Sequence, residues 1–324
     1  MSKGSGLIRN ISILTGLSIA TIHVLNRIET TSACAETVSR TREDKTYNWR
    51  YGIIDYKVKG YGTPILLLHD LTIGSSKAEY RYIYDTLSQN RKVYIPDLLG
   101  YGISDKPVMT YTASTYEDLI TDFIKNIVRS KTDVVVTGTT APIIIKLAHA
   151  NPKLIRNIIM INPLGLYDQN LIPSTQTKLL KILINIPVIG TFFYNLKCNR
   201  AAIEDLFKKE YLYDPDSVDS DKLGEIVTAY YRAAHEKGIF SKHAYASYLS
   251  QYMNCSILSE LQETDHSVLI IGGEYEKDIS DNIENYNYYN GAIESVIIPE
   301  TSHLPQVERP EEVISNIEVF LSND

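Results

Sequence analysis

The chain has 324 residues, of which 44% are hydrophobic, so it can bury one large core or a core with an inserted subdomain. Its formal net charge of −7 argues against nucleic acid or an anionic membrane surface as the main partner. The three cysteines are too few and too scattered for a disulfide framework or a zinc site, and we expect neither a metal nor another cofactor.

The N-terminal segment, residues 1–45, combines an apolar stretch with a polar linker. A basic start precedes the apolar run from Ile11 to Leu25, which serine, threonine and histidine residues interrupt. A full membrane span needs about 20 predominantly apolar residues, so this run is marginal. Ala33-Cys34-Ala35 is a small-residue motif of the kind that follows a signal sequence. The segment indicates export or membrane association through residues 7–26, and the alternative is a plain amphipathic helix in a cytoplasmic protein.

From residue 46 onward, patterns typical of strands and of helices alternate. Strands are predicted where β-branched and apolar residues run together, at Ile53–Val58, Ile65–Leu68, Lys92–Ile95, Val134–Val136, Leu154–Ile161, Ser267–Ile271 and Glu294–Ile298. Helical spacing of apolar residues occurs at Tyr80–Leu87, Thr115–Val128, Ile143–Leu147 and in a last helix that starts at Pro310. This alternation predicts a mostly parallel sheet with helices on both faces.

The alternation stops in residues 165–264, where the patterns are helical at Lys178–Ile184, Ile203–Lys208, Ile226–His235 and His243–Tyr252. We therefore expect an α/β core of residues 46–164 and 265–324, interrupted by a helical cap of residues 165–264. The cap is rich in isoleucine, leucine and tyrosine, as expected of an apolar wall against the core. This arrangement predicts a small apolar molecule as a partner, bound between core and cap.

Four motifs follow one another in an order that is typical of one fold. The run DVVVTGTTAPIIIKLA, residues 133–148, reads as a strand, a sharp turn and a helix, which is the context of a nucleophile elbow. LLLHDLTIGSS (66–76), YIPDLLGYGISDKP (94–107) and SHLPQVERPEEV (302–313) resemble the oxyanion-loop segment, the aspartate–glycine loop and the histidine loop of capped α/β-hydrolase-fold proteins. The resemblance extends from about residue 50 to the end of the chain. It implies an α/β-hydrolase fold, with a mostly parallel eight-stranded sheet flanked by helices and an inserted helical cap.

The resemblance also assigns a catalytic triad, in the chain order nucleophile, acid and histidine. It places the nucleophile at Thr140, the acid at Glu276 and the base at His303, with Asp278 as the nearby alternative acid. The histidine would take a proton from the nucleophile, and the carboxylate would hold the imidazole in the correct tautomer. A threonine hydroxyl can act as a nucleophile when a base lies beside it.

Three residues depart from the family pattern where a serine-hydrolase site is built. Thr140 replaces the serine of an elbow that commonly has φ > 0, where a β-branched residue is an outlier. Pro142 replaces a small residue, and Asp70 replaces the oxyanion-loop glycine and adds a negative charge. The oxyanion donors would be the backbone N–H groups of Leu71 and Ala141, which need no particular side chain.

Two functions are therefore predicted. The chain is either a hydrolase of a small apolar ester- or amide-type bond, acting through Thr140, Glu276 and His303, or a catalytically impaired relative that serves as a binding or scaffold protein. The dehalogenase and epoxide-hydrolase branches are not expected, because their nucleophile is an aspartate and no aspartate stands at the elbow. His69 and the loop from Asp97 to Pro107 are expected to serve the structure.

Overall fold

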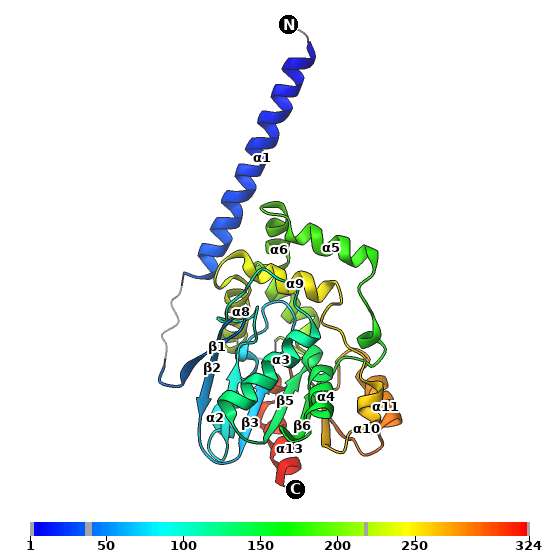
Figure 1. Ribbon diagram of the computed structural model, residues 1–324. Coiled ribbons are helices and arrows are strands. Elements are labelled where there is room, and N and C mark those ends of the chain that lie inside the picture. The colour runs from blue at the N-terminus through cyan, green and yellow to red at the C-terminus, as the bar shows by residue number, and fades with distance from the viewer. Residues whose placement is uncertain (1–2, 36–40, 217–219, 323–324) are drawn as a thin grey trace.

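An eight-stranded sheet forms the centre of the molecule in the computed structural model, which describes residues 3–35, 41–216 and 220–322 (Figure 1). The strand order is β1-β2-β4-β3-β5-β6-β7-β8. Both pairs that involve β2 are antiparallel, whereas the pairs from β4 to β8 are parallel. The predicted α/β-hydrolase sheet is therefore confirmed. The strand bounds are β1 Asp44–Trp49, β2 Gly52–Lys59, β3 Pro64–Leu68, β4 Lys92–Pro96, β5 Thr132–Thr137, β6 Ile155–Ile161, β7 Ser267–Gly273 and β8 Glu294–Ile298.

The inner strands are buried on both faces, because their residues form continuous apolar runs. In β5, for example, Val134, Val135 and Val136 expose no surface. Leu68 of β3 pairs with Val136 of β5 in parallel register. The residues two positions beyond this pair, Asp70 and Gly138, therefore leave the sheet side by side. The candidate site lies at this carboxyl edge of the sheet.

Helices cover both faces of the sheet. On one face, apolar side chains of α3 (Ala113–Phe123), α4 (Ala141–Ala150) and α11 (Ile279–Tyr289) pack against the strands. On the other face, α2 (Tyr84–Leu87) and α13 (Pro310–Ser322) do so, and the short α12 (Pro305–Glu308) precedes α13. The single helix predicted at Tyr80–Leu87 is wrong in detail, since a 3₁₀ turn, η1 (Lys77–Tyr80), is separated from α2.

A helical layer lies between β6 and β7. The described part of this stretch holds no strand and contains α5 (Thr175–Asn185), α6 (Ile189–Cys198), α7 (Arg200–Leu206), α8 (Ser220–His235), α9 (Lys242–Leu249) and α10 (Leu258–Glu263). Tyr194, Phe207 and Tyr230 of this layer pack in one cluster with Leu304 and Val307, which follow β8. The layer therefore covers the loop that carries His303.

Helix α1 (Lys3–Ala33) projects from the end of the molecule opposite the C-terminus (Figure 1). At its C-terminal end, Ala33 is buried in the same cluster as Tyr194 and Phe207. Within the described residues, no helix taken singly has the length and apolar composition that a membrane crossing requires. The pair α5 and α6, bent by 98°, meets that criterion of length and composition only when the two are taken together.

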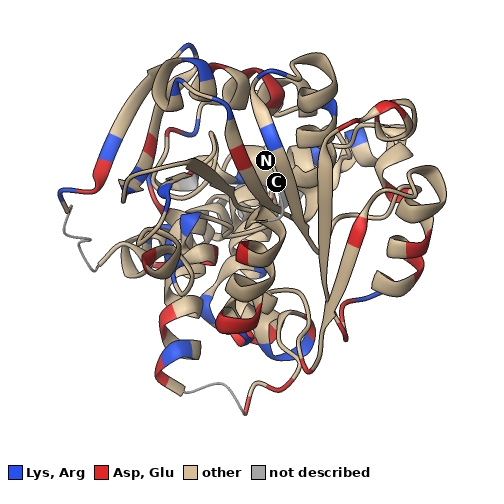
Figure 2. Cartoon of the chain, turned by 90° about the horizontal axis from the view of Figure 1, so that it is seen from below, with Lys and Arg blue, Asp and Glu red and all other residues tan. Residues whose placement is uncertain are grey.

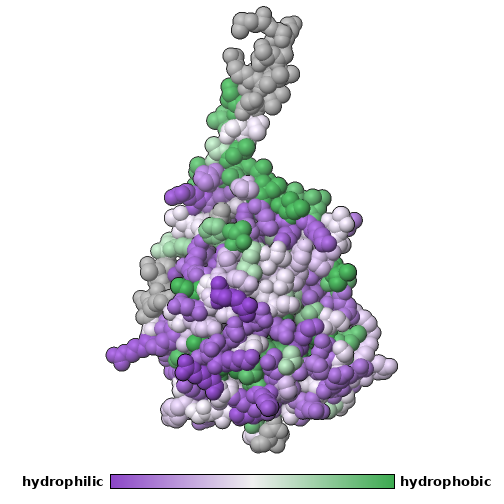
Figure 3. All heavy atoms as spheres, in the orientation of Figure 1, coloured by the Kyte–Doolittle hydropathy of each residue, from purple (hydrophilic) through white to green (hydrophobic). Residues whose placement is uncertain are grey.

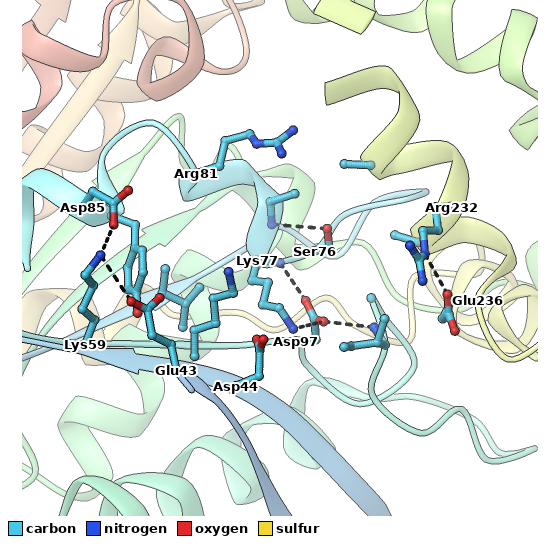
Figure 4. A pocket seen from close by; sticks show the side chains of 18 of the residues that line it. Glu43, Asp44, Lys59, Ser76, Lys77, Arg81, Asp85, Asp97, Arg232 and Glu236 are labelled. Carbon is cyan, nitrogen blue, oxygen red and sulfur yellow. Dashed lines mark hydrogen bonds and ion pairs between the residues drawn. The ribbon is translucent and has the colours of Figure 1, made fainter. Parts of the chain in front are cut away.

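A buried ion cluster fixes the loop that follows β4. The Lys77 amino group contacts the Asp97 carboxylate at 2.9 Å (Figure 4). It also contacts the carboxylate of Asp55. Both carboxylates are at most 2% exposed. Burial raises the pKa of Asp97, but Lys77, His69 and backbone N–H groups more than offset it, so the pKa lies below its ordinary value. Asp97 also accepts the Ile103 N–H at 3.0 Å, in agreement with the structural role predicted for this loop.

The substitution Lys77→Met should lower the free energy of unfolding by about 3–5 kcal/mol, because it removes the amino group that contacts two buried carboxylates. Lys59→Met is the matched control, since Lys59 pairs with Glu43 and Asp85 at more exposed positions. The control should cost less than about 1 kcal/mol. Urea unfolding followed by circular dichroism measures both variants, and equal losses would contradict the role assigned to the buried cluster.

Candidate active site

The elbow residue of this chain is Gly138. Strand β5 ends at Thr137, Gly138 has φ +57°, and a 3₁₀ turn then leads into α4 at Ala141. Thr140 has φ −78° and ψ −20°, an ordinary right-handed conformation. The assignment of the elbow to Thr140 is therefore corrected by two residues, because only the position of Gly138 has the left-handed backbone that the turn requires.

Thr140 and Ala141 do not take part in the site in the way the sequence predicted. The Thr140 hydroxyl donates to the His69 carbonyl at 2.8 Å, and the residue exposes no surface. The Ala141 N–H is used inside the 3₁₀ turn, where it donates to the Gly138 carbonyl. Neither group is directed at His303. The predicted nucleophile Thr140 and the predicted oxyanion donor Ala141 therefore do not have the geometry that these roles require.

The carboxylate of Asp70 fills the space beside Gly138. Its Oδ1 accepts hydrogen bonds from the Leu71 N–H at 2.7 Å and the Thr139 N–H at 2.8 Å. Its Oδ2 lies 3.6 Å from Nε2 of His303. A Cβ atom added to Gly138 would meet the Asp70 carboxyl carbon at 2.5 Å, so the glycine makes room for this carboxylate. The Leu71 N–H, which the sequence predicts as an oxyanion donor, thus donates to the Asp70 carboxylate, and the second donor to this oxygen is the Thr139 N–H and not that of Ala141.

Glu276 lies beside His303, and Asp278 does not. Nδ1 of His303 is 3.2 Å from both carboxylate oxygens of Glu276. Asp278 has φ +56°, is largely exposed and contacts Lys277 at 3.9 Å. The structure thus brings together Glu276 and His303 from the loops after β7 and β8. The ring of Tyr211 from the helical layer lies against the His303 ring, with centroids 4.4 Å apart and the planes tilted by 33°.

Both peptide groups that flank the Asp70 side chain are held by buried polar groups. His69 Nε2 accepts the Leu98 N–H at 2.9 Å, so Nδ1 carries the ring proton and donates to the Asp70 carbonyl at 2.6 Å. The Asp70 N–H donates to Glu79 at 3.0 Å, and the Tyr230 hydroxyl donates to the other oxygen of Glu79 at 3.0 Å. Burial and the negative charge of Asp70 raise the pKa of Glu79 to about 7. Asp70 is therefore fixed before any ligand arrives.

Sequence reasoning missed Thr139, Glu79, Tyr211 and Tyr230. Glu79 lies just before the predicted helix Tyr80–Leu87 and outside any motif, and the two tyrosines lie in the helical layer, also without a motif. Asp70 was the signal that could have found them. It replaces a glycine, and a carboxylate that is buried needs hydrogen-bond or ion-pair partners.

His303 lies between two carboxylates, which decides its charge. Burial alone would lower the pKa of His303, but its interactions with Asp70 and Glu276 outweigh burial and raise the pKa to about 10. For Asp70, burial raises the pKa, while His303 and the N–H groups of Thr139 and Leu71 bring it below its ordinary value. At neutral pH the site therefore holds an imidazolium and an ionised Asp70.

Within the described residues, no group of three or more histidine, cysteine, aspartate or glutamate side chains is arranged to hold a metal ion. The cavity in Figure 4, of about 740 Å³, lies away from the site and is lined by neither Asp70 nor His303. Its cations have partners of their own, as in the pairs Lys59–Asp85 and Arg232–Glu236, so its charges largely cancel.

We expect the His303 ring to stay protonated well above the ordinary histidine pKa of 6.5 and to titrate near 10. Asp70→Asn removes one of the two charges that raise the pKa and should move the titration downward. Because the folded-state pKa is raised, the stability from these ion pairs is complete below 6.5 and is lost as the pH rises through about 10. NMR of protein with labelled histidine measures the titration, and His303→Gln identifies the signal. A wild-type titration near 6.5 would contradict the assigned charge state.

Comparison with known proteins gives one family. A model described as "Alpha/beta hydrolase family" matches residues 65–316. An uncharacterized protein of Mycobacterium tuberculosis is 27% identical over 110 residues, which are 34% of this chain and 32% of that protein. A 2-hydroxymuconate semialdehyde hydrolase of a Pseudomonas species is 25% identical over 108 residues, 33% of this chain and 38% of the hydrolase. Each match spans only about a third of the relative's length.

Solved structures share the fold. An esterase from Thermogutta terrifontis superposes with a TM-score of 0.69 at 16% identity, covering 86% of this chain and 98% of the esterase. An enol-lactonase from Burkholderia xenovorans gives 0.67 at 15% identity, covering 86% and 100% of the two chains. At such identities the likeness speaks for the fold alone. Because the family model spans the sheet from β3 onward, the helical layer and the His303 loop, this chain belongs to the alpha/beta hydrolase family.

Proposed function

We propose that this chain is a hydrolase whose nucleophile is the carboxylate of Asp70, with His303 and Glu276 as its base and acid. The observation that carries the proposal is that the two oxygens of the Asp70 carboxylate have different partners. Oδ1 accepts two backbone N–H groups, while Oδ2 faces the imidazole. The proposed substrate is a small apolar molecule between core and cap with an electrophilic saturated carbon, such as an epoxide or an alkyl halide.

In the first step Oδ2 of Asp70 attacks the electrophilic carbon. A carbon–oxygen bond forms, the bond to the leaving group breaks, and its electron pair departs with that group as halide or, from an epoxide, as alkoxide. An alkoxide needs a proton. Tyr211 can donate it and become a phenolate, because burial raises its pKa well above the ordinary value and the phenol therefore holds a proton at neutral pH. The product of this step is an ester of Asp70.

In the second step water hydrolyses the ester. Esterification removes the negative charge of Asp70, which is one of the causes of the high pKa of His303. The imidazolium then gives its proton to the Tyr211 phenolate left by epoxide opening, or to solvent after halide release, and the neutral ring acts as the base that takes a proton from water. Water adds to the carboxyl carbon of Asp70, and the oxyanion on Oδ1 faces the N–H groups of Leu71 and Thr139. Collapse breaks the acyl carbon–oxygen bond, releases the alcohol and restores the carboxylate.

Acyl transfer through Thr140 has no comparable support. Its hydroxyl is committed to the His69 carbonyl, and an acyl oxygen would compete with Asp70 for the N–H groups of Leu71 and Thr139. The aspartate that the sequence lacks at the elbow is instead supplied by the loop after β3. With Asp70 as the proposed nucleophile, dehalogenase- or epoxide-hydrolase-type chemistry, which the sequence did not predict, becomes part of the proposal.

A second candidate function is binding without turnover, as in the binding or scaffold alternative. It is favoured by one observation: Asp70 is only 2% exposed, and Tyr211 lies over His303. A ligand between core and cap would then meet a closed site. The two functions differ in whether a covalent ester forms on Asp70.

A single turnover in heavy-oxygen water should place the label in Asp70 and not in the product, because water attacks the enzyme ester. The substrates are short 1,2-epoxides and haloalkanes, and mass spectrometry of the peptide reads the label. His303→Gln should trap the ester on Asp70, and Asp70→Asn should reduce turnover at least about a thousandfold.

Thr140→Val is the matched control and should leave turnover unchanged apart from a stability loss of about 1 kcal/mol. Label in the first product, or full activity in Asp70→Asn, would rule out Asp70 as the nucleophile. Binding of apolar ligands with no ester under any condition would favour the second candidate.

The double variant Gly138→Ser with Asp70→Gly should gain hydrolysis of p-nitrophenyl acetate, because it puts a hydroxyl at the elbow and empties the N–H pair. The gain should come with a stability loss of about 1–3 kcal/mol for a non-glycine residue at φ > 0. The matched control, Thr140→Ser with Pro142→Gly and Asp70→Gly, should remain inactive. Activity in the control but not in the Gly138 double variant would show that Thr140, and not Gly138, is the elbow position.

A further inference from the structure

We propose that helices α5 and α6, together with the exposed side of α1, form a face that docks onto the surface of an anionic lipid bilayer. This proposal does not depend on the chemistry of Asp70. We call this surface the apolar face. On the helix pair it consists of Leu179, Ile182, Leu183, Ile189, Phe193 and Leu196, all of them exposed.

The apolar face is the outer side of helices whose inner side is packed. In α6, Tyr194, Asn195 and Cys198 are buried, while Phe193 is 56% and Leu196 50% exposed. On α1, side chains such as Leu14, Leu17 and Leu25 are likewise exposed. Figure 3 shows apolar residues gathered where α1 leaves the body of the molecule. A contiguous exposed apolar surface of this kind marks an interaction site.

The helix pair and α1 are joined, so they present one face. The Asn26 side chain of α1 donates to the Val188 carbonyl at 2.9 Å and accepts from the Asn195 side chain at 3.0 Å. The Tyr231 hydroxyl of α8 donates to Glu29 of α1 at 2.9 Å. These contacts hold the C-terminal part of α1 against the helical layer, at the end of the molecule opposite the C-terminus (Figure 1).

The charges of these elements select the partner. The chain as a whole has a net charge of −7, yet residues 169–203 contain no acidic residue and carry the exposed basic residues Lys178, Lys197 and Arg200. Residues 1–28 also contain only basic charges. By contrast, acidic and basic residues are interspersed over the molecule in the view from the C-terminal end (Figure 2). Apolar side chains bordered by basic ones suit an anionic lipid surface.

A second copy of the chain fits the apolar face less well. In a symmetric dimer the same surface meets itself, so the basic residues of both copies would face one another. Like charges at such a contact repel, whereas anionic headgroups would neutralise them. The charge pattern therefore favours a bilayer over self-association.

Vesicle co-sedimentation of the full chain tests the proposal. The protein should bind vesicles of phosphatidylcholine with phosphatidylglycerol, and should bind vesicles of phosphatidylcholine alone at least about tenfold more weakly, because the basic residues then lack counter-charges. Raised salt should weaken the binding to the mixed vesicles. Leu179→Glu with Ile182→Glu and Phe193→Glu should reduce binding to the mixed vesicles by about tenfold or more, since it places carboxylates where lipid contacts form.

The matched control, Val108→Glu with Tyr288→Glu and Val319→Glu, adds the same charge at exposed apolar residues elsewhere and should bind as the wild type does. Circular dichroism establishes that both triple variants are folded. Three results would each overturn the proposal: no binding of the wild type to either vesicle, equal losses in both triple variants, or a loss in the variant Leu14→Glu with Leu17→Glu but none in the variant of α5 and α6. The wild type could instead form a dimer and bind no vesicles. If only the triple variant of α5 and α6 dissociated that dimer, the apolar face would be assigned to a second copy of the chain.

Discussion

The site depends on one steric constraint: the Asp70 carboxylate occupies the space that a side chain at position 138 would need. A side chain at the elbow and a carboxylate on the neighbouring loop cannot coexist, because a Cβ on Gly138 would lie 2.5 Å from the Asp70 carboxyl carbon. The parallel register of β3 and β5 brings the two residues to the same point. The glycine after β5 and the carboxylate after β3 are thus two parts of one steric constraint.

The rest of the site is arranged around that charge. A buried carboxylate is costly unless it is paired and hydrogen-bonded. Asp70 has two N–H donors, the imidazolium of His303 opposite it, and backbone partners in His69 and Glu79. Such complete satisfaction gives a fixed orientation, which is also what a nucleophile needs before its substrate arrives.

The sequence predicts the inner strands and the pair Glu276–His303 well, because each is encoded by adjacent residues. Strand β1 is not predicted, since Asp44–Trp49 is polar and only Trp49 in it is buried. The elbow is misplaced for a different reason. A glycine followed by two threonines fits the motif in more than one register, and only the backbone shows that Gly138 has φ > 0. The role of Asp70 depends on the β3–β5 register, which no local pattern contains.

The helical layer between β6 and β7 connects the site with the apolar face, because it contributes residues to both. Tyr211 and Tyr230 of this layer contact His303 and Glu79, while α5 and α6 of the same layer carry the exposed apolar side chains. Since Asp70 is nearly inaccessible, a ligand can reach it only if the layer shifts. A bilayer that held α5 and α6 would act on the same body that closes the site. If the proposed docking takes place, apolar molecules dissolved in lipid would meet the helical layer at the surface that binds the bilayer.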